Sequence, residues 1–351
     1  MQQIYRIAVL PGDGIGPDVI REACKALDAV AQRMPELSFE IRHYQVGAGE
    51  YLRSGDPLPP DTLESVSRSD AILLGAMGLP NVRWPGGTEM APQLDLREKL
   101  DLYCGLRPVR LYHERDTPLK GYKAGDIDLV IVRENTEGLF YSRLQKAEAD
   151  ATEVRDIMRI SRACSERLFR SAFHQAQRRR KHVTLVDKSN VLPSMAFFRR
   201  IFNEVAEEFP DVETSRVYVD AASLYLVQRP QTFDVIVTEN MFGDILSDLA
   251  AGLVGGMGMA PSADIGDGHA VFQPSHGSAP DIAGKGIANP AATILSAAMM
   301  LDWLGSEETR RGAAMIRHAV DEVFAEPGTR TADLGGRLST RELGDAIAAA
   351  V

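Results

Sequence analysis

Cysteine and tryptophan are scarce in this chain of 351 residues, which has three cysteines and two tryptophans. The cysteines, Cys24, Cys104 and Cys164, are odd in number and lack the spacing of a metal site. A stable disulfide framework is therefore not expected. Such a set suits a reducing compartment in which the thiols are buried and inert.

Positive charge is also in short supply, with 39 Lys and Arg against 49 Asp and Glu and a net charge of −10. That balance argues against a nucleic-acid or anionic-membrane partner. No apolar run is long enough to span a membrane, and the first residues reach a strand and a Pro-Gly turn without a signal-peptide core. We therefore expect a cytoplasmic protein, with enough apolar residues for two core-forming units.

Short β-branched runs alternate with helical stretches along the whole chain, which is the pattern of the α/β class. The expected strands are 6–10, 39–44, 71–75, 128–135, 182–188, 216–219 and 234–238. The expected helices are 18–33, 61–68, 94–103, 161–181 and 194–208, one that begins at Asp244, and a last one begun by the capping box Ser339-x-x-Glu342. The segment 274–301 is expected to be a loop that ends in a small-residue apolar helix, with Asn289 as its N-cap.

A glycine-rich turn, Pro11-Gly-Asp-Gly-Ile-Gly-Pro17, follows the first expected strand. It fails the dinucleotide fingerprint of a Rossmann fold, because Pro17 stands where the third glycine should be. We interpret the turn as a place where the backbone must lie very close to a neighbouring group, which the sequence alone does not identify. Further along, the Pro- and Gly-rich loop 78–92 carries Trp84 and is either a binding lid or a plain connector.

The most informative stretch of the chain is residues 233–256, FDVIVTENMFGDILSDLAAGLVGG. Asp244 and Asp248 are four apart, so on a helix they lie on one face and repel unless a cation lies between them. Mg²⁺ or Mn²⁺ fits, since these ions take one or two carboxylates plus water and substrate oxygens. The alternative is an acidic pair that favours the helix N-terminus through the macrodipole.

Three arginines, Arg97, Arg107 and Arg133, stand near the ends of expected elements. Their planar guanidinium groups suit bidentate binding of carboxylates, although each could instead form a surface salt bridge. The basic run 178–181 closes an expected helix. We interpret it as charge that complements the helix C-terminus.

Six motifs together resemble the β-decarboxylating dehydrogenases, the family of isopropylmalate, isocitrate, homoisocitrate and tartrate dehydrogenases. They are LPGDGIGP, LRPVRLY, RENTEG, VDKSNVLP, NMFGDILSD and HGSAPDIAGKGIANP, and they cover essentially the whole chain. The resemblance implies an isopropylmalate dehydrogenase-like two-domain α/β fold, not a Rossmann fold. It implies a cofactor-binding domain of 1–102 plus 255–351 and a substrate, metal and dimer-interface domain of 103–254. A homodimer with shared active sites would follow.

The resemblance also implies residue roles. Arg97, Arg107 and Arg133 would hold the two carboxylates of a malate-like substrate. Asp244 and Asp248, with Asp220 of the partner subunit, would hold the divalent metal, and Lys188 of the partner subunit would be the acid/base group. The cofactor would be NAD, bound by the set His276, Gly277, Ser278, Ala279, Asp281 and Asn289 with Ile15 and Asn190. Asp281-Ile282 favours NAD, because a carboxylate accepts hydrogen bonds from ribose hydroxyls and repels a 2′-phosphate.

Two departures from the family pattern concern catalysis and specificity. The tyrosine that helps protonate the enol is replaced by Phe140, and Tyr141 comes next; in an extended segment the two would point to opposite faces. Either Tyr141 protonates the enol in place of the missing tyrosine, or Phe140 marks a loss of that acid. Ahead of Arg97, where the family recognises the C3 substituent, the chain has Met90, Ala91, Gln93 and Leu94.

A polar Gln93 would be costly to bury unpaired against an isopropyl group. We therefore expect oxidative decarboxylation of a (2R)-malate-type diacid such as malate, tartrate or a 3-alkylmalate. The alternative is 3-isopropylmalate dehydrogenase of leucine biosynthesis.

Two other classes of protein share some of these features. A periplasmic-type carboxylate-binding protein would have no use for Lys188 and the aspartates together with a nucleotide loop. A regulatory subunit of a hetero-oligomeric dehydrogenase would keep the fold and lose catalytic groups, whereas here Phe140 marks the one such loss.

Overall fold

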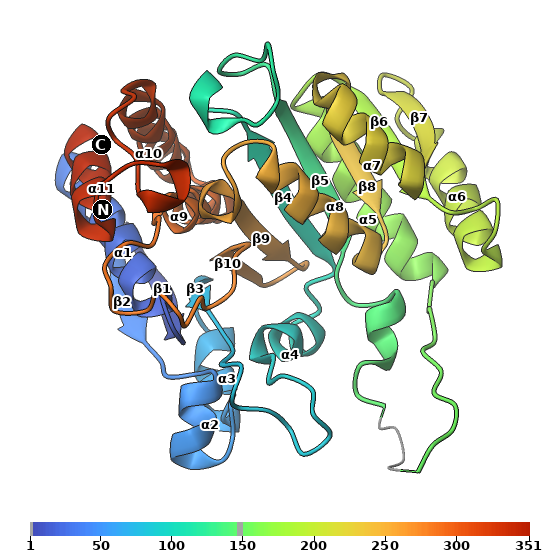
Figure 1. Ribbon diagram of the computed structural model, residues 1–351, viewed down its shortest axis with the longest axis horizontal. Helices are drawn as coiled ribbons and strands as arrows, with labels where there is room; N and C mark the ends of the chain where they lie inside the picture. The colour runs from blue at the N-terminus through green and yellow to red at the C-terminus, as the bar shows by residue number, and fades with distance from the viewer. Residues whose placement is uncertain (1–2, 146–149) are drawn as a thin grey trace. The chain divides into compact units, whose positions relative to one another are not determined.

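The computed structural model describes residues 3–145 and 150–351 and divides the chain into two compact units. Unit 1 combines Met1–Leu100 with Gly255–Val351, and unit 2 is Asp101–Val254. Both units mix helices with strands, which confirms the α/β class (Figure 1).

The sheet of unit 1 has the strand order β2-β1-β3-β10-β9. β1 pairs in parallel with β2 and β3, β10 pairs in parallel with β3, and β9 is antiparallel to β10. In Figure 1 the helices α1 and α11, from opposite ends of the sequence, lie side by side, and they are in contact. The elements of this unit are β1 (Gln3–Gly12), α1 (Gly16–Arg33), β2 (Leu37–His43), α2 (Ala48–Ser54), α3 (Pro60–Ser67), β3 (Ala71–Ala76), α4 (Pro92–Lys99), η4 (Met257–Met259), β9 (Pro261–Ile265), β10 (Ala270–Pro274), α9 (Ala291–Leu304), α10 (Glu307–Ala325), η5 (Ala332–Leu334) and α11 (Thr340–Ala350).

The sheet of unit 2 has the order β4-β5-β8-β6-β7. β4 is antiparallel to β5, and the other neighbours are parallel. The elements of this unit are β4 (Cys104–Arg110), η1 (Glu114–Asp116), β5 (Asp128–Glu134), η2 (Leu139–Ser142), α5 (Arg162–Gln177), β6 (His182–Asp187), α6 (Pro193–Ala206), β7 (Glu213–Tyr218), α7 (Val219–Gln228), η3 (Pro230–Thr232), β8 (Val235–Thr238) and α8 (Asn240–Gly252).

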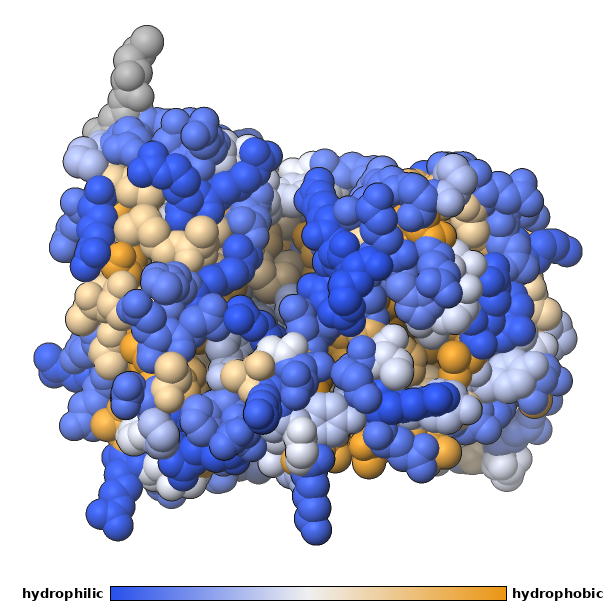
Figure 2. All heavy atoms as spheres, turned by 90° about the horizontal axis from the view of Figure 1, so that it is seen from above, coloured by the Kyte–Doolittle hydropathy of each residue, from blue (hydrophilic) through white to orange (hydrophobic). Residues whose placement is uncertain are grey.

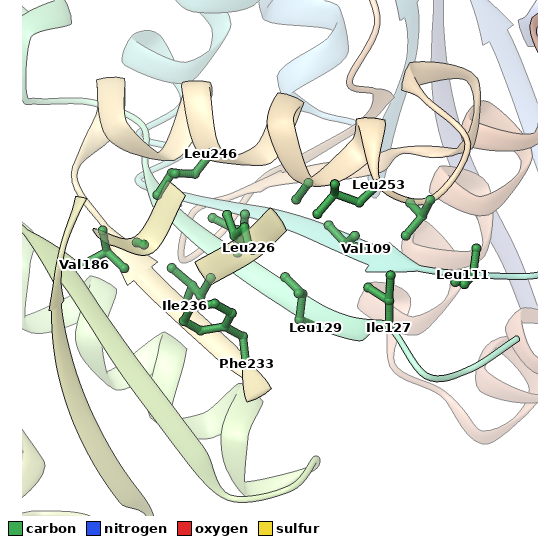
Figure 3. Close-up of a cluster of buried hydrophobic side chains, with 14 residues drawn as sticks. Val109, Leu111, Ile127, Leu129, Val186, Leu226, Phe233, Ile236, Leu246 and Leu253 are labelled. Carbon is green, nitrogen blue, oxygen red and sulfur yellow. The ribbon is translucent and has the colours of Figure 1, made fainter. Parts of the chain in front are cut away.

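A cluster of buried hydrophobic side chains packs α8 onto the sheet of unit 2 (Figure 3). Leu129 and Ile131 of β5 and Leu246 and Leu253 of α8 belong to it. Residues two apart on a strand face the same side, which is why alternate residues of β5 meet the helix. This packing fixes which face of α8 is turned away from the core.

Several expected boundaries were wrong for local reasons. α8 begins at Asn240 instead of Asp244, because the Glu239 carboxylate accepts the backbone N–H groups of Met241 and Phe242 and caps the helix. α4 ends at Lys99 instead of residue 103, and Asp101 just beyond it has a positive φ of 51°. Strand β9 lies in the stretch 252–268, for which the sequence pattern predicts no strand.

The basic run 178–181 lies after the last residue of α5, whereas the expected helix included it. Arg179 pairs with Asp234 at 2.8 Å and with Asp128, and Lys181 pairs with Asp211 at 3.1 Å. These bonds tie the run to the starts of β5 and β8 and to Asp211 before β7. The run directly follows the last turn of α5, and its effect on the helix dipole remains a prediction.

Among the described residues, no helix is long and apolar enough to cross a membrane. Hydrophilic residues cover most of the face drawn in Figure 2, with hydrophobic ones in small groups between them.

Candidate active site

The packing of α8 presents its two aspartates away from the core of unit 2. Leu246, Ala250 and Leu253 form the buried stripe of the helix, and Asp244 and Asp248 stand about 200° around the helix from Leu246. Because the helix begins at Asn240, Asp244 already lies in the second turn. The attraction of a helix N-terminus for acidic groups falls off within the first turn, so the macrodipole does not account for this pair.

Arg133, at the end of β5, reaches the same helix. Its Nε and Nη2 donate to Asn240 Oδ1 at 3.1 and 2.8 Å, and its Nη1 forms an ion pair with Asp244. Gly243 makes this approach possible, since a Cβ added there would lie 2.7 Å from Arg133 Cγ. A buried arginine and an acidic side chain are thereby held together on the exposed side of α8.

The charges around Asp248 suit a cation. Desolvation raises the pKa of its carboxyl above the ordinary value, and the negative charge of Asp244 adds to the rise. The positive charges of Arg107 and Arg133 lower the pKa but do not cancel the rise. Two repelling carboxylates one turn apart are a hard-oxygen donor set of the kind that Mg²⁺ or Mn²⁺ bridges. In the described part of the chain, no third acidic, histidine or cysteine side chain completes a metal-binding group.

Lys188 and Asp220 form a separate pair in unit 2. Lys188 follows β6 directly, Asp220 lies in the first turn of α7, and Lys188 Nζ is 2.8 Å from Asp220 Oδ1. The hydrogen bond from Lys188 lowers the pKa of the Asp220 carboxyl. The expectation that this pair serves the partner's site remains a prediction.

Phe140 and Tyr141 lie in η2, not in the extended segment that we expected. Residues of a 3₁₀ helix are about 120° apart, so the two rings still point in different directions. The Arg133 guanidinium lies 5.5 Å from the centre of the Phe140 ring, whereas Tyr141 is half-exposed and lies beneath Arg159 at 4.8 Å. Residue 140, rather than 141, is therefore the neighbour of Arg133.

In unit 1, α4 carries the expected specificity residues. Arg97 is buried, and its Nε donates to Asp264 Oδ2 on β9 at 2.8 Å, while Gln273 of β10 donates to the same oxygen at 2.6 Å. Met90 is buried. Gln93 lies one turn before Arg97, and within the described residues its buried Oε1 has no hydrogen-bond partner.

The expected cofactor loop begins after β10. Desolvation lowers the pKa of His276, so its ring is neutral near pH 7. Its Nδ1 lies 2.9 Å from the Gly277 carbonyl and must therefore donate, which leaves Nε2 as an acceptor; that atom is buried and has no partner among the residues described. The Asp281 carboxylate is exposed. The loop thus carries an unpartnered acceptor, His276 Nε2, and an exposed carboxylate, that of Asp281. Both would suit a ligand rich in hydroxyl and amino groups, such as a dinucleotide.

The glycine-rich turn packs against this loop. Ile15 donates its backbone N–H to the Ser278 carbonyl at 2.8 Å, and a Cβ added to Gly14 would lie 1.9 Å from the same oxygen. The neighbouring group that the glycine-rich turn lies so close to is therefore the cofactor loop. Ala279 and Gly277 complete the loop, and Asn190 is exposed in unit 2 after β6.

The carboxamide of Asn289 has partners inside unit 1, and its expected contact with the cofactor remains a prediction. Its Oδ1 accepts the backbone N–H of Ala291 at 3.0 Å, and its Nδ2 donates to Asp333 at 3.1 Å. The N-cap of α9 is Pro290 and not Asn289 as expected, although Asn289 still binds the first N–H of the helix from one residue earlier. Asp333 was missed in the sequence, because it is an isolated acidic residue 44 positions away with no motif around it.

Comparisons with known proteins agree with this geometry. Residues 6–347 match the isocitrate/isopropylmalate dehydrogenase family. The chain is 46% identical to 3-isopropylmalate dehydrogenase of Moorella thermoacetica, over 98% of each chain. It is also 46% identical to isocitrate/homoisocitrate dehydrogenase of Thermus thermophilus, over 99% of this chain and 98% of that one.

A solved structure agrees as well. Isocitrate dehydrogenase from Methylococcus capsulatus superimposes with a TM-score of 0.89 at 39% identity, and 99% of each chain is covered. The fold expected from the motifs is confirmed. The chain therefore belongs to the isocitrate/isopropylmalate dehydrogenase family and is an oxidatively decarboxylating dehydrogenase.

Proposed function

We propose that this enzyme oxidises and decarboxylates a 3-substituted (2R)-malate with NAD and a divalent metal. The observation that carries the proposal is the cluster on α8, where Arg133 is bound to Asn240 and paired with Asp244 one turn before Asp248. The arginine suits a substrate carboxylate, and the two aspartates suit a hard cation.

The chain's own residues would bind the acid and move its protons. Arg107 and Arg133, both buried, would hold the carboxylates and orient the C2 hydroxyl. Asp244 and Asp248 would hold Mg²⁺ or Mn²⁺, which when bound acts as a Lewis acid on the substrate oxygens. Lys188 would take the proton from the C2 oxygen and later hold a proton at the same oxygen as CO₂ leaves.

The cofactor loop would present NAD. Asp281 would accept hydrogen bonds from the ribose hydroxyls, and its negative charge would oppose a 2′-phosphate. His276 Nε2, a buried acceptor, would receive a donor of the adenosine half. Bound in this way, NAD would supply the acceptor for the hydride that leaves C2.

Sequence identity to the relatives does not decide which group the substrate carries on C3. Identity is equal, at 46%, to a relative named for isopropylmalate and to one named for isocitrate and homoisocitrate. Another relative, from Methanocaldococcus jannaschii, is named for both 3-isopropylmalate and 3-methylmalate and is 44% identical. Further relatives, from Aquifex aeolicus at 42% identity and Corynebacterium aurimucosum at 45%, are also named for 3-isopropylmalate. Because that name recurs among the relatives, a 3-alkylmalate, with 3-isopropylmalate first, is the leading candidate.

A malate- or tartrate-type acid is the second candidate, and Gln93 supports it. Its unpartnered Oε1 would accept a hydrogen bond from the C3 hydroxyl of tartrate, which malate lacks, whereas an alkyl group would leave it unpaired at a cost of about 1–3 kcal/mol.

A homodimer is proposed on two grounds. Large apolar side chains are exposed on unit 2, among them Val191 at 64%, Leu224 at 51% and Ile245 at 57%. Asp220 also pairs with Lys188 instead of joining Asp244 and Asp248, as expected if that pair serves a second subunit. A regulatory subunit is disfavoured, because the arginines, aspartates and lysine needed for turnover are all present.

The test is NAD reduction, followed by absorbance, over 3-isopropylmalate, isocitrate, malate and tartrate with Mn²⁺. We expect turnover with at least one acid, coupled to CO₂ release and abolished by chelator. Turnover that persists in chelator would refute the metal site. Oxidation without CO₂ release would refute the decarboxylation.

A further inference from the structure

The carboxylate of Asp13 is buried at the centre of three loops of unit 1. It lies in the glycine-rich turn after β1 and is 6% exposed. Oδ1 accepts the backbone N–H of Gly49, and Oδ2 accepts those of Ala48 and Gly78, each at 2.8 Å. Hydrogen bonds to an ionised acceptor are about twice as strong as neutral ones. One side chain therefore fixes both the start of α2 and the start of the segment 78–91.

Gly78 passes this connection on to the cofactor loop. Its N–H is bound to Asp13, and its carbonyl accepts the hydroxyl of Ser278. The Ser278 carbonyl in turn accepts the N–H of Ile15, two residues after Asp13. Three hydrogen bonds thus link Asp13, Gly78, Ser278 and Ile15 in turn. The chain from Asp13 to Ile15, within the glycine-rich turn, closes the ring.

The segment 78–91 is braced on the same support. The Trp84 ring meets the edge of Tyr51 on α2, with ring centroids 5.5 Å apart. Arg83 binds Glu89 across the segment at 2.9 Å and the Pro80 carbonyl at 3.0 Å. Because Asp13 binds the first residues of α2, it supports this segment from both sides.

We propose that Asp13 is a positioning residue for the dinucleotide cofactor, acting through Gly78 on Ser278. Both carboxylate oxygens are used by the backbone and the side chain is buried, so Asp13 acts without touching the ligand. By holding Ser278 it fixes the loop that presents His276 and Asp281. The inference rests on the proposed function of that loop as the NAD site.

The first test is the steady-state kinetics of Asp13→Asn with NAD. Asparagine has one acceptor oxygen and would turn an NH₂ group toward a backbone N–H, so at least one of the three bonds is lost. We expect KM for NAD to rise about tenfold, equivalent to about 1.4 kcal/mol. At saturating NAD, kcat should stay within about twofold, because the acid and metal groups are untouched.

A matched control separates positioning from simple loss of stability. Asp234 is also buried and accepts a backbone N–H, that of His182 at 3.2 Å, but its partners His182 and Arg179 both belong to unit 2. Asp234→Asn should lower the melting temperature without changing KM for NAD. If the two variants are equally destabilised and both leave KM unchanged, Asp13 has no positioning role.

A second measurement tests the route through Gly78. Ser278→Ala removes the hydroxyl bound to the Gly78 carbonyl, so its effect on KM should overlap with that of Asp13→Asn in the double variant. Full additivity would overturn the route.

A third measurement needs no cofactor. In a Trp303→Phe background, Asp13→Asn should shift the emission of Trp84 to the red, because α2 and Gly78 are released together. An unchanged spectrum would count against the proposal. Failure of the wild-type enzyme to reduce NAD would instead refute the proposed function, and the emission test would still report on Asp13.

Discussion

Replacing Gly243 by alanine would test whether α8 must touch Arg133 for the substrate site to work. The added Cβ would lie 2.7 Å from Arg133 Cγ and 2.8 Å from its Cβ. Carbon atoms in contact prefer about 3.5–4.0 Å, so the helix and the arginine must separate by roughly 1 Å. The bonds from Arg133 to Asn240 and Asp244 span that same gap.

The expected loss of activity is much larger than the loss of stability. Overpacking costs about 1–3 kcal/mol, and the better helix propensity of alanine returns about 1 kcal/mol. The free energy of unfolding should therefore fall by about 0–2 kcal/mol. A displacement of about 1 Å in a substrate-binding group can cost about 10²-fold in rate, so kcat/KM for the acid should fall by about that factor.

Gly252→Ala is the matched control in the same helix. Nothing lies within 4 Å of a Cβ added at Gly252. This variant should be stabilised by up to about 1 kcal/mol and keep its activity. Thermal unfolding and kcat/KM would be measured on both. A Gly243→Ala enzyme that is folded and fully active would refute the reasoning, because the contact would then have no bearing on Arg133.

Four further predictions concern the proposed chemistry. Asp248→Asn should abolish turnover at ordinary Mn²⁺ concentrations while leaving circular dichroism unchanged, since a metal ligand is lost; near-normal activity would place the cation elsewhere. NAD should be preferred over NADP by at least about tenfold in kcat/KM, and Asp281→Ala should narrow that ratio, because one repelled charge is removed. Mixed inactive Lys188→Ala and Asp248→Asn subunits should regain activity if sites are shared, whereas no recovery after verified exchange would place Lys188 in its own chain's site. Phe140→Tyr should speed CO₂ release relative to hydride transfer in single turnover, and Tyr141→Phe should be nearly silent; a large selective loss in Tyr141→Phe would reverse these roles.

The identity of the elements followed from local pattern. β-branched runs became strands, and the capping box at Ser339 and Glu342 is present with both of its hydrogen bonds. Errors arose where a single side chain or backbone angle set the boundary. Glu239, for example, caps α8 so that the helix begins four residues before the expected start, and glutamate is not a common N-cap residue.

The residues of the candidate site were also named from the sequence, but their partners were not. Arg97 stood out as an arginine at a helix end, whereas its bond to Asp264 joins residues 167 positions apart. The interpretation of Gly14 as a close-approach residue named no partner, and the structure supplies Ser278.

The sequence by itself determined the α/β class, the order of most elements and the motifs that mark the family. Those properties depend on periodicity and on residues within a few positions of one another. Only the tertiary structure decided that hydrogen bonds link Asp13 to Gly78 and Gly78 to Ser278. It also decided that Phe140 rather than Tyr141 lies beside Arg133. Such contacts arise when packing brings together segments that are distant in the chain, and no local pattern in a single sequence records which distant groups will meet.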